Sequence, residues 1–171
     1  LEAAGYSVAR EYYVNDAGRQ MDILGLSVYL RWLEANGQSF DFPAGGYRGD
    51  YIRDIAREIE AAGVSILESL FDDLPAGTDD EIIDALIQRA RQGLGTEIFE
   101  RIRQHALESI RADIEEDLAE FGVVFDRWYS EQSLTTDGRI DDALAVLEKS
   151  GKVYEKDGAR WFRATDFGDE K

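Results

Sequence analysis

The sequence predicts a predominantly α-helical α/β protein that opens with a strand and a helix and closes with a small β-hairpin. Apolar residues recur every three or four positions over most of the chain, which predicts helices, and glycines separate these runs. Short runs rich in valine and aromatic residues lie near both ends and predict the few strands.

The first strand and helix are expected between residues 7 and 36. Ser7–Val14 is the strand, and Asn15 and Asp16 after it are typical helix-capping residues. From residue 17 to Asn36 the apolar residues form two neighbouring stripes, so this helix should be covered on more than one side. Since a lone strand is unstable, Ser7–Val14 needs partner strands, either from later in this chain or from outside it.

Three helices are predicted in the middle of the chain, each ending at a glycine. They run from the cap Asp50 to Gly63, from Thr78 or Asp79 to Gly93 and Gly95, and then to Gly122. The last is the longest, with apolar residues spaced by four: Ile98, Ile102, Ala106, Ile110, Ile114 and Leu118.

The remaining elements are shorter. Val123–Phe125 is a strand candidate, and a helix is expected from Asp137 to Ser150. Val153–Glu155 and Arg160–Phe162 flank Asp157-Gly158, a pair typical of tight hairpin turns.

Composition limits the function. The formal charge of −17, from 19 basic and 36 acidic residues, should repel a polyanion, so we expect weak or no nucleic-acid binding by this chain alone. Without cysteine there is no disulfide or thiolate metal site. No uncharged run is long enough to cross a bilayer and no secretory signal is visible, which favours a cytoplasmic protein without a membrane partner.

The titratable residues form no pattern typical of a catalytic or metal site. The acidic pairs are adjacent in sequence rather than helically spaced, which favours solvated surface: Asp72-Asp73, Glu115-Glu116 and Asp141-Asp142. The only histidine, His105, lies within a helix and is interpreted as a surface or boundary residue.

Four blocks, in order, resemble arginyl-tRNA synthetases, which are class I aminoacyl-tRNA synthetases. The blocks are Glu11–Gln20, Gly46–Ile52, Phe125–Glu131, and Tyr154–Arg163 running into Thr165–Lys171. The resemblance implies the edge of a split class I nucleotide-binding (Rossmann-like) fold plus a helical connective insertion with a C-terminal β-hairpin. Residues 1–36 would be a strand-helix unit of the catalytic domain, residues 37–164 the insertion, and residues 165–171 the return toward the catalytic sheet.

The resemblance also implies roles for individual residues. The rim of the arginine and ATP pocket would include Asn15, Asp16, Gly18 and Gln20. The surface along the tRNA acceptor end would include Tyr47, Asp50, Tyr51, Trp128 and Glu131. The return to the sheet would include Asp166, Gly168 and Asp169.

The catalytic signatures of the family are missing from these 171 residues. Neither a His-x-Gly-His-type motif nor the lysine loop that holds the ATP phosphates is present, and the first residue is not methionine. We therefore expect an internal fragment with no catalytic and no metal-binding residues of its own, inactive alone and without a bound cofactor. The parent enzyme would use ATP and Mg²⁺, with L-arginine and tRNA as its other partners.

Two alternatives come from the residues themselves. The charge is compatible with a stand-alone acidic helical module that binds proteins or mimics a nucleic acid. The last helix and hairpin have the order of a winged helix, but the basic face that such a domain needs is absent.

Trp128 and Tyr129 could either stack on a tRNA end or pack the short strand against the long helix.

Overall fold

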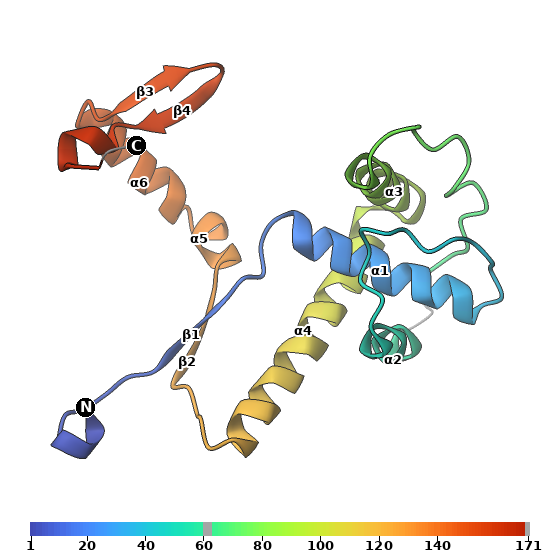
Figure 1. Ribbon diagram of the computed structural model, residues 1–171, viewed down its shortest axis with the longest axis horizontal. Coiled ribbons are helices and arrows are strands. Elements are labelled where there is room, and N and C mark those ends of the chain that lie inside the picture. Colours follow the sequence, from blue (N-terminus) through green and yellow to red (C-terminus); the bar gives the residue numbers. More distant parts are fainter. Residues whose placement is uncertain (60–62, 170–171) are drawn as a thin grey trace. The chain divides into compact units, whose positions relative to one another are not determined.

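The computed structural model describes residues 1–59 and 63–169, which form two compact units (Figure 1). Unit 1 joins Leu1–Asn15 to Asp126–Lys171, and unit 2 is Asp16–Phe125. Residues 16–36 therefore pack with the helices that follow them. The division into family domains at residues 36 and 164 stays a prediction.

The described part of unit 2 is a four-helix assembly built around α1. Its helices are α1 (Arg19–Ala35), α2 (Asp50–Glu58), α3 (Asp79–Leu94) and α4 (Thr96–Glu120), and α1 packs against the other three. Every residue from Ile23 to Arg31 is buried, because helices cover α1 on several sides. This confirms the two-stripe prediction for the first helix.

The crossing of α1 and α4 depends on Gly25. A Cβ atom there would lie 3.2 Å from Cβ and 3.3 Å from Cα of Arg103. A side chain would therefore press on the α4 backbone, and glycine permits the close approach.

The helices α2 and α3 begin at different kinds of N-cap residue. Thr78 caps α3 in a capping box: its hydroxyl accepts from the Glu81 amide at 3.3 Å, and the Glu81 carboxylate accepts from the Thr78 amide at 2.7 Å. The cap predicted at Asp50 is wrong, because Gly49 is the N-cap and Asp50 is the first helical residue. There the carboxylate still suits the positive end of the helix.

The longest helix is continuous, as predicted, but its buried face differs in detail. Phe99, Ile102, Arg103 and Ala106 are buried. Ile114 and Leu118 are only half-buried. A spacing of four drifts around a helix of 3.6 residues per turn, so a stripe of this spacing cannot keep facing one core.

Unit 1 contains a parallel pair of strands. β1 (Glu11–Val14) pairs with β2 (Arg127–Ser130) in the register Glu11↔Arg127, and it is shorter than the predicted Ser7–Val14. The strand predicted at Val123–Phe125 is wrong. The Val123 amide donates to the Leu118 carbonyl at 2.7 Å, and so helps to end α4 instead of joining a ladder.

The C-terminal part of unit 1 is a pair of helices and a hairpin. It comprises α5 (Gln132–Thr136), α6 (Arg139–Lys149), β3 (Val153–Lys156) and β4 (Ala159–Phe162), with 3-10 turns η1 (Glu2–Ala4) and η2 (Ala164–Phe167) in the same unit. The φ angles of 54° at Asp157 and 74° at Gly158 confirm the predicted tight turn. α5 was not predicted.

The two units differ in their cores. The buried apolar residues belong to unit 2, and no residue in the described part of unit 1 is buried. None of the described helices combines the length and the apolar character needed to span a membrane.

Candidate functional site

The junction between β1 and α1 carries four of the predicted site residues. Asn15 is exposed at the end of unit 1, whereas Asp16 is only 7% exposed. Gly18 is the N-cap of α1 with φ of 84°, and Gln20 is exposed in the first turn. Among the described residues no side-chain hydrogen bond caps α1, so the interpretation of Asn15 or Asp16 as a cap is wrong. The N-cap is Gly18, whose positive φ glycine adopts without strain.

Arg103 of α4 holds the backbone at Asp16. Its Nη1 donates to the Asp16 carbonyl at 3.4 Å, and its Nε donates to Glu100 at 2.8 Å. The hydrogen bond with Glu100 is the main reason that the pKa of Arg103 is raised, and the same bond lowers the pKa of Glu100. A guanidinium fixed by one carboxylate therefore positions the chain at Asp16.

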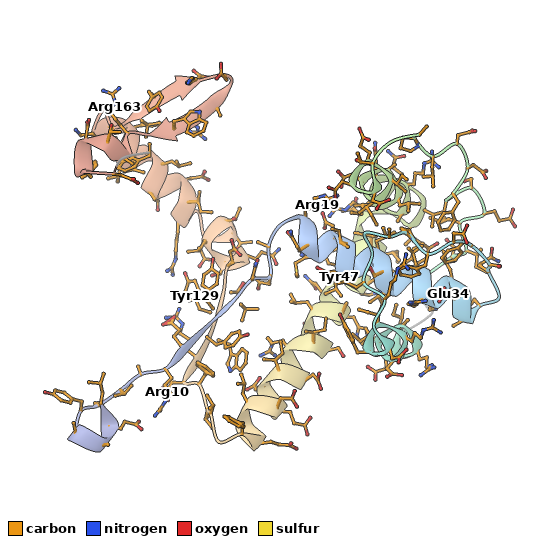
Figure 2. All side chains as sticks on the ribbon, viewed as in Figure 1. Arg10, Arg19, Glu34, Tyr47, Tyr129 and Arg163 are labelled. Atoms are coloured by element: carbon orange, nitrogen blue, oxygen red, sulfur yellow. The ribbon has the colours of Figure 1, made fainter. Side chains whose placement is uncertain are left out.

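Further ion pairs hold the start of α1, where Figure 2 labels Arg19. Arg19 donates to Asp84 at 2.7 Å and to the Asp80 carboxylate at 3.0 Å, and the bond to Asp84 is the main cause of its raised pKa. Arg91 donates to Asp22 at 2.6 Å. These pairs could not be predicted from the sequence, because nothing local relates residues that lie 65 or 69 positions apart.

The segment from Gly46 to Tyr51 is anchored on α1. The Tyr47 amide donates to Ser27 Oγ at 2.9 Å, and the Ser27 hydroxyl donates to the Ile23 carbonyl at 2.7 Å. Tyr47 is half-buried, while Asp50 and Tyr51 are exposed at the start of α2. The structure therefore brings these three predicted residues together on unit 2.

Trp128 and Glu131 lie in unit 1, in and just after β2. The Trp128 ring stacks on Tyr12 with centroids 4.5 Å apart, and Tyr129 stacks on Tyr13 at 6.3 Å. The Glu131 amide donates to the Val14 carbonyl at 3.0 Å. Trp128 thus packs on the neighbouring strand, and it remains half-buried.

Asp166, Gly168 and Asp169 lie beside the hairpin. Asp166 accepts from Lys152 Nζ at 2.7 Å, and this bond is the main cause of its lowered pKa. Gly168 has φ of 88° and ends η2, and the next residue, Asp169, is exposed.

The remaining titratable residues agree with the sequence interpretation. The three acidic pairs are exposed. His105 is a boundary residue with Nε2 3.9 Å from Glu58 Oε2. In the described ranges, no three histidine or carboxylate side chains are placed to hold a metal ion.

Comparison with known proteins identifies relatives along the whole chain. No protein-family model matches it. The chain is 52% identical over 180 residues to the arginine–tRNA ligases of Thioalkalivibrio sulfidiphilus and of Legionella pneumophila, all of the chain matching 31% of each relative. A crystal structure described as an arginyl-tRNA synthetase from Campylobacter jejuni shares 26% identity with a TM-score of 0.69, over 99% of this chain and 32% of that one.

These matches confirm the resemblance predicted from the four blocks. They also show that the chain spans about 31% of the length of the curated relatives. The mostly helical α/β architecture of this chain, with its small sheets, is similar to the matched 32% of the solved structure.

Proposed function

We propose that this chain is a segment of an arginine–tRNA ligase, and that the protein containing it activates L-arginine with ATP and transfers the arginyl group to the 3′ end of tRNA. The observation that carries the proposal is 52% identity to arginine–tRNA ligases along the whole chain. The alternative, an acidic module that binds proteins or mimics a nucleic acid, is not favoured, because only the net charge supports it.

The connection between β1 and β2 supports the finer assignment to a split class I fold. The two strands are parallel neighbours, yet residues 15–126 separate them. Parallel strands require a crossover connection, and here that connection contains a complete helical unit. Residues 1–36 are accordingly assigned to the edge of the nucleotide-binding sheet, 37–164 to the insertion, and 165–171 to the return.

The site residues keep the roles that the family resemblance gives them. Asn15, Asp16, Gly18 and Gln20 form one rim of the arginine and ATP pocket; the acceptor-end surface contains Tyr47, Asp50, Tyr51, Trp128 and Glu131; the return contains Asp166, Gly168 and Asp169. The fixed backbone at Asp16 supports its role, since a substrate pocket needs rigid walls.

The proposal gives this segment no catalytic group of its own. Stabilising the pyrophosphate leaving group requires cationic and donor groups at fixed positions, and the histidine and lysine signatures that supply them in the family are not among these residues. In the described part of the chain no three carboxylate or histidine side chains converge to hold a metal ion. We expect the parent enzyme to act in the cytoplasm.

The experiment compares the full-length protein with the isolated 171-residue chain. The full-length protein should attach arginine to tRNA, and the isolated chain should show no arginine-dependent exchange of pyrophosphate into ATP. In the full-length protein, Asp16→Ala should lower turnover while circular dichroism stays unchanged. Asp113→Ala, which removes an exposed carboxylate from α4, is the control for the lost charge. Exchange by the isolated chain, or full turnover by Asp16→Ala, would contradict the assignments.

A further inference from the structure

A small pocket between α1 and α2 concentrates positive charge. It has a volume of about 190 Å³ and is lined by Arg31, Glu34, Ala35, Arg53 and Arg57. We call it the Arg31 pocket, and Glu34 in Figure 2 marks its α1 side. Three of its five residues are arginines, in a chain that carries 36 acidic and only 19 basic residues. The pocket therefore departs from the charge of the chain as a whole.

Arg31 is the fixed part of the pocket. Its side chain is 6% exposed, Nη1 donates to Glu34 at 2.7 Å, and Nη2 donates to the Arg48 carbonyl at 3.1 Å. Its guanidinium carbon lies 4.1 Å from the centroid of the Phe42 ring. The guanidinium plane is thus held in place by three groups.

One donor of Arg31 has no partner within the described residues. Nε is buried and makes no hydrogen bond. Buried donors are nearly always satisfied in folded proteins, so the hydrogen bonding of the Arg31 guanidinium is incomplete within the described residues.

Arg53 and Arg57 supply the exposed part of the pocket. They stand one helical turn apart on α2, and their side chains are 50% and 68% exposed. Arg53 lies 4.0 Å from Glu34, and Arg57 pairs with Asp54. Three guanidinium groups against the carboxylates of Glu34 and Asp54 leave an excess of one positive charge.

The chemistry of this pocket suits a single phosphate group. Guanidinium groups match phosphate oxygens with paired N–H donors, and they bind such anions better than an ammonium does. The pocket is too small for a nucleotide with its base but has room for one phosphate. Inorganic phosphate and a backbone phosphate of RNA share this chemistry.

The location favours RNA. Arg31 bonds to the carbonyl of Arg48, and Arg53 follows Tyr51 by two residues, so the pocket adjoins the Tyr47–Tyr51 segment assigned above to the tRNA acceptor end. We propose that the Arg31 pocket binds one backbone phosphate of tRNA and so holds the acceptor arm beside Tyr47 and Tyr51. The RNA source rests on the proposed function, whereas the anion chemistry does not.

The test uses the full-length protein and a double variant, Arg53→Gln with Arg57→Gln. Both side chains are exposed, so the fold should survive, which the melting temperature checks. The KM and the directly measured Kd for tRNA should rise about tenfold, with kcat and the KM for arginine unchanged. The slope of log Kd against log salt concentration should fall by about one, as expected for one lost phosphate contact.

The matched control is Arg111→Gln with Arg160→Gln. Their side chains, on α4 and β4, are 42% and 58% exposed, and the change removes the same net charge. The control should alter the Kd for tRNA less than twofold. If both double variants weakened tRNA binding equally, the cause would be a general effect of charge and the proposal would be overturned. An unchanged Kd for tRNA in the Arg53/Arg57 variant would also overturn it.

Inorganic phosphate distinguishes the two sources of the anion. If phosphate raises the melting temperature of the wild type but not of the double variant, and the Kd for tRNA is the same in both, the pocket takes free phosphate and the RNA proposal is wrong. If the wild-type protein attaches no arginine to tRNA, the proposed function fails. The direct Kd measurement still decides whether the pocket contacts RNA.

Discussion

Tyr29 in the centre of α1 gives a sharp test of the packing in unit 2. Its side chain is completely buried, and its hydroxyl donates to the Ser65 carbonyl at 2.8 Å. Burial raises the pKa of Tyr29 to about 12, against an ordinary value of 10.0, and a backbone hydrogen bond with Leu67 partly opposes this shift. Tyr29→Phe removes the hydroxyl and its ionisation and keeps the ring.

At neutral pH the variant should be less stable. A hydrogen bond of this kind contributes about 1 kcal/mol net, and Ser65 is exposed, so water can approach its carbonyl once the hydroxyl is gone. We therefore expect Tyr29→Phe to lower the free energy of unfolding by about 1 kcal/mol at pH 7. An exposed tyrosine, Tyr6, provides the control, because Tyr6→Phe should change that energy by less than about 0.5 kcal/mol.

The order of stability should reverse in alkali. Because the folded pKa is above the unfolded one, the unfolded phenol ionises first, and stability that is complete below pH 10 is lost as the pH rises toward 12. At pH 11 this loss is about 1.4 kcal/mol for the wild type and zero at this position for the variant. The wild type should then be less stable than Tyr29→Phe by about 0.4 kcal/mol.

Urea denaturation followed by far-ultraviolet circular dichroism at pH 7, 9, 10 and 11 measures both effects. The other tyrosines are common to the two proteins, so their ionisation cancels in the difference. A margin between wild type and variant that stays constant from pH 7 to pH 11 would refute the reasoning about the buried phenol.

Two further predictions concern α3 and α1. Thr78→Ala should lower the free energy of unfolding by about 1 kcal/mol, since it removes the side-chain half of the capping box; the urea midpoint measures this, and an unchanged midpoint would mean that the cap is not formed in solution. Gly25→Val should lower the stability by about 1–3 kcal/mol, because its side chain meets the α4 backbone at Arg103; a melting temperature equal to that of the wild type would contradict the close helix crossing.

The local structure of this chain could be predicted from the sequence because its signals are local. Apolar spacing of three and four predicted α1, α3 and α4, the choice of Thr78 or Asp79 marked the start of α3, and Asp157-Gly158 marked the hairpin turn. Helix periodicity, capping and turn chemistry act over a few residues, so one sequence carries them in full. The four motif blocks also sufficed to predict the resemblance to arginyl-tRNA synthetases that the comparison found.

The tertiary structure decided which distant residues meet. Val123–Phe125 is as apolar as many strands, but β2 forms at Arg127–Ser130, because Arg10 pairs with Asp126 and the Val123 amide is used to end α4. Likewise, no local pattern relates Arg19 to Asp84, or Arg31 to the carbonyl of Arg48. The hydrogen-bond partner of a charged side chain depends on which acceptor the fold places near it. That partner is determined only when the helices have packed. The backbone support at Asp16 and the Arg31 pocket are therefore products of the tertiary structure alone.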